Sequence, residues 1–92
     1  MKLAVIIPVY NAENTIRKAV KSIDTTHDVE IICINDGSTD RTKQVLTELQ
    51  KEVKHLIVYH QDNQGAAKSR NMGLSAMSDD IDAFMFLDAD DQ

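Results

Sequence analysis

Four short apolar runs alternate along the chain with segments that have the periodicity of amphipathic helices. The runs cover residues 3–7, 29–34, 56–59 and 83–87. Each is nearly continuous in apolar residues, which is typical of strands covered by helices on both faces. A chain that alternates strands and helices in this way is expected to form a parallel sheet with right-handed crossovers.

The three intervening segments each carry one apolar helix face. The expected stripes are Ile16, Ala19, Val20 and Ile23, then Val45, Leu46, Leu49 and Val53, then Ala66, Ala67, Leu74 and Met77 within a helix over residues 65–77. Gly73 lies inside this third helix, where glycine costs about 1 kcal/mol relative to alanine, so we predict close packing there. The sequence therefore predicts the α/β class, as a Rossmann-like βαβαβαβ parallel sheet with helices on both faces.

Length and charge limit the function classes. The 92 residues predict one small domain without a linker, and no apolar run approaches the roughly 20 residues of a membrane span. Six of the 15 acidic residues fall after position 78, so residues 1–78 hold 15 − 6 = 9 acids against 10 bases. The near-neutral remainder argues against a nucleic-acid partner. The single cysteine, Cys33, lies in an apolar run, and we interpret it as core filling in a reducing, cytoplasmic compartment.

Polar or unusual residues follow each predicted strand. They form the segments 8–11, 35–40, 61–65 and 88–91. In a parallel sheet all strands end on the same edge, and ligands of open α/β sheets bind outside that edge. We therefore expect the four segments to line one crevice.

The most telling of these segments is Asp88-Ala89-Asp90-Asp91 at the end of the fourth strand. Like charges after a buried strand repel one another unless a cation arrives. Carboxylate oxygens suit hard divalent ions that also bridge to phosphate, which favours a Mg²⁺ or Mn²⁺ site. The alternative is an acidic first turn of a helix.

Three other side chains have competing interpretations. Tyr10 follows a strand-ending proline, where its ring could stack on a nucleobase or cover a helix end. Asp36 could contact a ligand or cap the turn before the second helix. Arg70 on the third helix could pair with a diphosphate or an aspartate, or form a surface salt bridge.

Taken together, these motifs resemble the family-2 inverting glycosyltransferases of the GT-A fold. The residues that carry the resemblance are Val5 to Asn11, Ile34 to Asp40, Asn63-Gln64-Gly65 with Ala67 to Asn71, and Phe86 to Asp91. They occur in the family's order and with similar spacing, over the whole chain. Singly, Asp-Gly-Ser or Asp-x-Asp would be weak signals.

The resemblance implies a nucleotide-sugar donor, most often a UDP-sugar. It implies that Pro8, Val9 and Tyr10 contact the nucleoside and that Asp36 bonds the uracil edge. By the same resemblance, the remaining site residues are Asn63, Gly65 and Arg70 for base and diphosphate, Asp88 for the ribose, and Asp90 for Mn²⁺ or Mg²⁺. The resemblance leaves two roles open for Asp91: it lies either on the acceptor side or among the residues that surround the metal ligands.

The resemblance also implies a single inverting displacement at the anomeric carbon. The general base of the family lies downstream of Asp-x-Asp, so we expect no catalytic base within residues 1–92. We expect these residues to form one nucleotide-sugar-binding domain, cut off after Asp-x-Asp, of a longer enzyme. The sugar, the glycan, lipid or protein acceptor, homo-oligomer formation and membrane contact at the inner face stay open. Polysaccharide or glycolipid synthesis is plausible by family analogy.

The alternative from a different class is a non-catalytic nucleotide- or metal-binding module, or an assembly domain that uses an open sheet edge. Other α/β enzymes fit less well. Aspartate-based phosphatases carry Asp-x-Asp after their first strand, whereas here it follows the fourth. The glycine-rich signatures of sugar nucleotidyltransferases and P-loop proteins do not occur.

Overall fold

The computed structural model describes residues 1–24 and 28–89. Its elements, in chain order, are β1 (Leu3–Val9), α1 (Ile16–Lys21), β2 (Val29–Asp36), α2 (Thr42–Glu52), β3 (Leu56–Gln61), α3 (Ala66–Ala76) and β4 (Ala83–Phe86). The predicted alternation of strand and helix is confirmed. The strand and helix boundaries differ from the predictions by a few residues.

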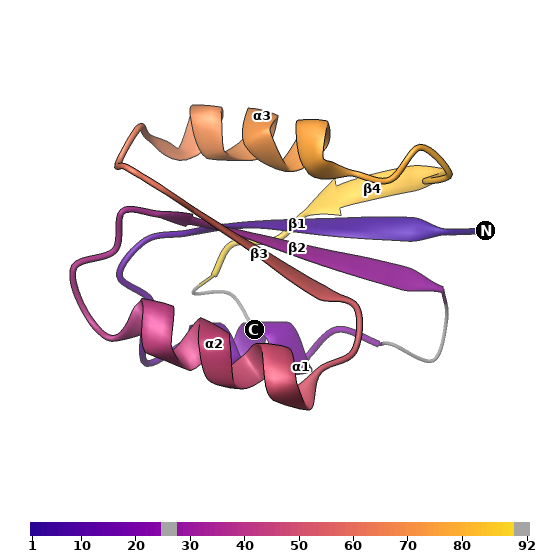
Figure 1. Ribbon diagram of the computed structural model, residues 1–92. Helices are drawn as coiled ribbons and strands as arrows, with labels where there is room; N and C mark the ends of the chain where they lie inside the picture. Colours follow the sequence, from indigo (N-terminus) through magenta and orange to yellow (C-terminus); the bar gives the residue numbers. More distant parts are fainter. Residues whose placement is uncertain (25–27, 90–92) are drawn as a thin grey trace.

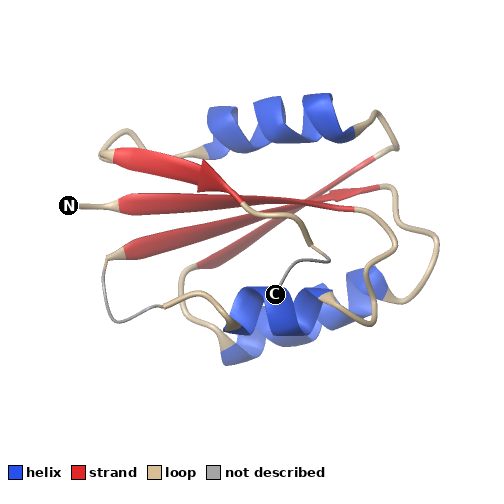
Figure 2. Ribbon diagram, turned by 180° about the vertical axis from the view of Figure 1, so that it is seen from behind, coloured by secondary structure: helices blue, strands red, loops and turns tan. Residues whose placement is uncertain are grey.

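The four strands form one sheet in the order β3-β2-β1-β4, and every neighbouring pair is parallel. Helix α3 covers one face of the sheet, while α1 and α2 lie side by side on the other (Figures 1 and 2). Helices therefore cover both faces, as predicted. All four strands point their carboxyl ends toward the same edge, which is the edge that carries the polar segments.

Strand residues alternate between two cores. The larger core lies under α1 and α2 and includes Val5, Ile7 and Cys33, whereas the smaller core lies under α3 and centres on Ile6 and Ile32. Burying each aliphatic side chain contributes about 1.5–3 kcal/mol, so the central strands β1 and β2 carry most of the stability. Cys33 is fully buried, as predicted, and burial raises the pKa of its thiol to about 12.

The prediction that Pro8 ends the pairing of the first strand is wrong. Pro8 lies within β1 and is in register with Ile34 of β2. The Ile6 carbonyl accepts a hydrogen bond from the Leu87 amide on the β4 side, so Pro8, two residues later, faces that same side. The β4 pairing has ended there, and the missing N–H of proline therefore costs no ladder bond.

Helix α3 packs through small residues. Ser69 and Gly73 are its buried positions, whereas Ala66 and Ala67, predicted to lie on the apolar face, are exposed. A Cβ atom placed on Gly73 would lie 2.3 Å from Cγ2 of Ile6, which confirms the predicted close packing. This approach sets the rotation of α3 and turns Ser69 toward the end of the sheet.

Strand β4 forms one edge of the sheet and is only partly covered. Its side chains Phe84, Met85 and Phe86 are 48%, 46% and 40% exposed, so both of its faces present apolar surface. The two phenylalanine rings pack edge to face with centroids 5.7 Å apart. No helix in the described ranges has the length and apolarity needed to cross a membrane.

Candidate functional site

The ends of β1 and β4 and the start of α3 enclose a cleft of about 270 Å³ at the carboxyl edge of the sheet. Its lining residues are Pro8, Tyr10, Asn11, Ala12, Thr15, Ala66, Arg70, Asp88 and Ala89. Of the four strand-end segments that we expected to converge, those after β1 and β4 supply lining residues, whereas the segment 61–65 only leads into the Ala66 wall. The fourth segment, after β2, forms hydrogen bonds with Asn11 and with the loop that precedes α3.

The Pro8–Tyr10 segment forms one wall. Tyr10 is 52% exposed, so its ring is available to a ligand, whereas Val9 is buried in the core under α1 and α2. The side chain of Val9, which we placed in the site, therefore points away from the cleft, and only its backbone remains for a ligand contact. Pro8 lines the cleft directly.

Asn11 fixes the conformation of this wall. It has φ 47°, in the left-handed region that asparagine tolerates better than most residues. Its backbone N–H donates to Ser38 Oγ (3.0 Å), and its Oδ1 accepts from the Thr39 N–H (2.8 Å). These bonds tie the end of β1 to the loop after β2.

Arg70 and Asp88 supply opposite charges from two other elements. The Arg70 guanidinium carbon lies 6.0 Å from the centroid of the Phe86 ring, a cation–π contact that holds the side chain beside the cleft. Asp88 follows β4 and is exposed. Among the described residues, neither Arg70 nor Asp88 forms a hydrogen bond or an ion pair, so both groups remain available to a ligand.

Asp36, at the end of β2, is a hydrogen-bonding centre. Its Oδ1 accepts from Gln61 Nε2 (2.9 Å) and the Gln64 N–H (2.8 Å), and its Oδ2 accepts from the Gly65 N–H (2.9 Å). The residue is 4% exposed. Asp36 therefore anchors the loop that leads into α3. From the sequence we had considered a ligand contact or a cap on the turn before the second helix, and neither interpretation included this anchoring role.

Asn63 and Gly65 lie on this anchored loop. Asn63 Nδ2 donates to the Asp36 carbonyl oxygen (3.2 Å), and Gly37 lies so close that a Cβ there would be 2.6 Å from the Asn63 nitrogen. Gly37 also has φ +70°, where side chains are strained. Gly65 immediately precedes α3, with φ +96°. Neither residue lines the cleft; both are exposed, and Gly65 directly precedes Ala66 in the cleft wall.

The stability of the folded chain should fall in acid because of Asp36. Burial raises the pKa of its carboxyl, but the hydrogen bonds from Gln61, Gln64 and Gly65 lower it by more, so the pKa lies below its ordinary value of 3.8. A folded-state pKa below the unfolded one stabilises the fold above about pH 4, and this stabilisation is lost as the pH falls through the folded pKa.

We therefore expect the Tm, followed by circular dichroism, to drop as the pH is lowered from 5 to 3, and to drop less in Asp36→Asn. Some decline should remain in the variant. Burial raises the pKa of Asp40 too, but hydrogen bonds, chiefly from Thr42, lower it by more, so this pKa also lies below its ordinary value. An equally steep decline in Asp36→Asn would show that the carboxyl of Asp36 contributes nothing to the acid response.

The carboxylates after β4 are the candidate metal ligands. Asp88 lies in the cleft, whereas Asp90, which we expected to bind the metal, and Asp91 are outside the described residues. Within residues 1–24 and 28–89, no three His, Cys, Asp or Glu side chains gather as a metal site would require. One or two carboxylates beside a phosphate ligand are nevertheless the donor set that Mg²⁺ commonly uses, so Asp88 fits such an ion.

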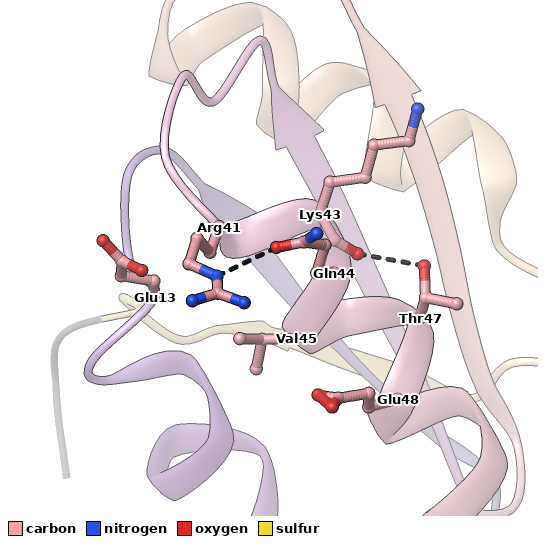
Figure 3. A pocket seen from close by; sticks show the side chains of 7 residues that line it. All are labelled: Glu13, Arg41, Lys43, Gln44, Val45, Thr47 and Glu48. Carbon is pink, nitrogen blue, oxygen red and sulfur yellow. Dashed lines mark hydrogen bonds between the residues drawn. The ribbon is translucent and has the colours of Figure 1, made fainter.

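A larger hollow of about 570 Å³ lies elsewhere, along the outer surface of α2 (Figure 3). Its lining residues are Glu13, Arg41, Lys43, Gln44, Val45, Thr47 and Glu48, and none of them is buried. Arg41 Nε donates to Gln44 Oε1 (3.1 Å) within it. The lining comes from α2, from Arg41 before it and from Glu13 before α1, and it holds no aromatic ring and no strand end, so we assign the site to the smaller cleft.

Three residues of the site were not singled out from the sequence. Asn11 and Gln61 were expected only as members of the polar segments 8–11 and 61–65, and Ala66 only as an apolar position of the third helix. The partner of Gln61 could have been found from strand register, since Gln61 is paired with Asp36 across β2 and β3. That pairing requires the strand order, which periodicity does not supply.

Comparisons with known proteins identify the family and the fold. The family model described as glycosyl transferase family 2 matches residues 4–92. Glycosyltransferase GlyA of Streptococcus pneumoniae serotype 4 is 43% identical over 98% of this chain. A crystal structure of TarS from Staphylococcus aureus, residues 1–349, superposes with a TM-score of 0.83, 31% identity and 99% coverage of this chain.

TarS residues 1–349 have also been crystallised with UDP, and that structure is 29% identical to this chain with a TM-score of 0.82, over 98% of this chain and 28% of its own. The mannosyltransferase PcManGT of Pyrobaculum calidifontis, solved with GDP-Man and Mn²⁺, shares the fold at 22% identity and a TM-score of 0.80, over 97% of this chain and 27% of its own.

This chain spans only part of its relatives. It covers 13% of the length of GlyA and 28% of the TarS chain of residues 1–349. The match nevertheless extends over nearly all of this chain, including the cleft and the loop that Asp36 anchors. The fold is that of GT-A glycosyltransferases, and the chain belongs to glycosyltransferase family 2.

Proposed function

We propose that this chain binds the nucleotide-sugar donor, a UDP-sugar, of an inverting, metal-assisted glycosyltransferase. The observation that carries the proposal is the cleft at the carboxyl edge of the sheet. It brings together the exposed ring of Tyr10, the guanidinium of Arg70 and the carboxylate of Asp88. An aromatic platform, a cation and a carboxylate are the groups that a nucleoside diphosphate needs. The UDP complex of TarS, which shares the fold at 29% identity, supports the choice of UDP.

The uridine would lie against the Pro8–Tyr10 wall. Tyr10 would stack on the base, with the backbone of Val9 and the ring of Pro8 beside it. Asp36 would accept a hydrogen bond from the N3–H of uracil, and Asn63 would hold the loop beside it. Because the loop is already hydrogen-bonded to Asp36, little ordering would be needed when the nucleotide binds.

The diphosphate would lie toward α3 and β4. Arg70 would bond the phosphate oxygens, and the glycine turn at Gly65 would allow the backbone to approach them. Asp88 would bond the ribose, and Asp90 would hold Mg²⁺ or Mn²⁺ against the diphosphate. Such an ion, when bound, offsets the negative charge that develops on the leaving nucleoside diphosphate.

The transfer itself would be a displacement at the anomeric carbon of the sugar with inversion. The acceptor hydroxyl forms the new bond as the bond to the diphosphate oxygen breaks, and a carboxylate general base takes the hydroxyl proton. We assign no such base to residues 1–92. On its own, the chain is expected to bind the donor rather than turn it over, in a cytoplasmic setting where nucleotide sugars are made.

Replacing Arg70 with glutamine tests the diphosphate position. Losing a charge-assisted hydrogen bond should weaken UDP about tenfold or more by isothermal titration calorimetry, while uridine without phosphate binds as before. Lys68→Gln is the matched control, since Lys68 is an exposed cation on the same helix and lies outside the cleft lining. An equal loss in both variants would mean that only the general charge of α3 matters and would contradict the assignment of Arg70.

A further inference from the structure

The side chain of Gln61 is held between two buried groups at the end of β3. Its Nε2 donates to Asp36 Oδ1 (2.9 Å) and to Ser69 Oγ (3.1 Å). Ser69 is fully buried and Asp36 is 4% exposed. An ionised carboxylate only accepts hydrogen bonds, so the amide must present its nitrogen to Asp36, and both of its N–H groups are used. Gln61 is therefore fixed in one orientation.

This contact determines how many acceptor positions Asp36 has left. A carboxylate offers about four, two on each oxygen. Oδ1 accepts from Gln61 Nε2 and from the Gln64 N–H, and Oδ2 accepts from the Gly65 N–H. Both positions of Oδ1 are filled, and a single position remains, on Oδ2.

Nucleobases differ in the number of hydrogen bonds that they can donate to such a carboxylate. Uracil presents one donor, N3–H, between two carbonyl oxygens, and needs one acceptor position. Guanine presents N1–H and the exocyclic N2–H side by side, and pairs fully with a carboxylate only when each oxygen accepts one of them. On Asp36 the second guanine donor would face a saturated Oδ1. A buried donor left without an acceptor weakens binding.

We propose that Gln61 is a positioning residue that sets base specificity: by filling Asp36 Oδ1 it limits the carboxylate to one hydrogen bond and so favours a uracil over a guanine nucleotide. The inference rests on the proposed function, in which Asp36 contacts the base. It assigns to Gln61 a role that neither the cleft lining nor the family motifs indicate.

The test compares UDP with GDP, both with Mg²⁺, by isothermal titration calorimetry on the whole chain. The wild type should prefer UDP by about tenfold or more, the value of one well-made hydrogen bond to a charged group. Gln61→Met keeps the size and flexibility of the side chain but removes the donor, so the preference should fall by about tenfold. Gln50→Met, the same change at an exposed position of α2, should leave the preference unaltered.

A measurement on the wild type alone removes any dependence on how well the variant folds. Inosine diphosphate has the N1–H of guanine but not its exocyclic amine. With one acceptor position on Asp36, it should bind at least as well as GDP. GDP binding about tenfold more tightly than inosine diphosphate would show that the carboxylate accepts both guanine donors, and would overturn the inference.

The remaining outcomes separate this inference from the proposed function. A parallel loss of UDP and GDP affinity in Gln61→Met, with the preference unchanged, would reduce Gln61 to a structural residue and overturn the inference alone. A folded wild-type chain that binds neither nucleotide would overturn the proposed function, and the inference with it.

Discussion

Asp36→Ala is expected to lower both the stability of the fold and its affinity for UDP. The substitution leaves the donors of Gln61, Gln64 and Gly65 without their charged acceptor. Hydrogen bonds to charged groups contribute about 1.5–3 kcal/mol each and are not additive, so we expect a loss of about 3 kcal/mol. Each kcal/mol lowers the Tm of a domain of this size by roughly 4–8 °C.

The matched control is Asp62→Ala, which removes an exposed carboxylate from the same loop. Thermal unfolding of Asp62→Ala should be close to that of the wild type. UDP affinity should fall at least tenfold in Asp36→Ala, by roughly the contribution of one such hydrogen bond. A Tm for Asp36→Ala within about 2 °C of the wild-type value would contradict the anchoring role of the carboxylate, since that corresponds to less than about 0.5 kcal/mol.

Gly73→Val is expected to be the most disruptive change in α3. A Cβ at this position would lie 2.3 Å from Cγ2 of Ile6, which is itself fully buried in the middle of β1. Neither partner can yield without moving the backbone, because Ile6 is branched at its own Cβ. Overpacking a close contact of this kind typically costs 1–3 kcal/mol, and we expect about 3 kcal/mol for valine by urea unfolding.

Two comparisons isolate the cause of this loss. Ser75→Val places the same side chain on the exposed surface of α3 and should cost well under 1 kcal/mol. The second comparison uses smaller substitutions. Gly73→Ala should lower the free energy of unfolding less in an Ile6→Ala background than in the wild type, since alanine at position 6 leaves room for the new methyl group at position 73. Strictly additive effects of the two changes would show that the contact between β1 and α3 is not the source.

The architecture could be predicted from sequence because strand and helix periodicities leave few alternatives. The order of elements, the parallel sheet and the gathering of strand ends depend only on local patterns and on the handedness of crossovers. The close packing at Gly73 was equally predictable, since a glycine inside a helix weakens it unless space is needed.

Features that depend on how elements lie against one another were not predictable in this way. The rotation of α3 buries Ser69 and exposes Ala66, because the contact of Gly73 with Ile6 decides which side faces the sheet. Pro8 stays in β1 only because β4 is shorter on that side. Periodicity describes a segment by itself and carries neither kind of information.

The candidate site likewise combines features that could be predicted from the sequence with features that could not. Tyr10 proved exposed and Arg70 and Asp88 line the cleft, since a strand end and the first turns of a helix place side chains there in any such sheet. Of the three donors to Asp36, Gln61 depends on the pairing of β2 with β3, and Gln64 and Gly65 depend on the path of residues 62–65. Its binding roles, like those of the other site residues, stay predictions.

The most direct test of donor binding is an amide NMR titration of the chain with UDP, with and without Mg²⁺, using ADP and Asp90→Ala as controls. We predict shifts at Tyr10, Asp36, Arg70 and Asp88 that are larger with UDP than with ADP, that strengthen with Mg²⁺, and that lose this metal dependence in Asp90→Ala. A well-dispersed spectrum of the folded chain that responds to neither nucleotide, with or without the ion, would contradict donor binding at this cleft.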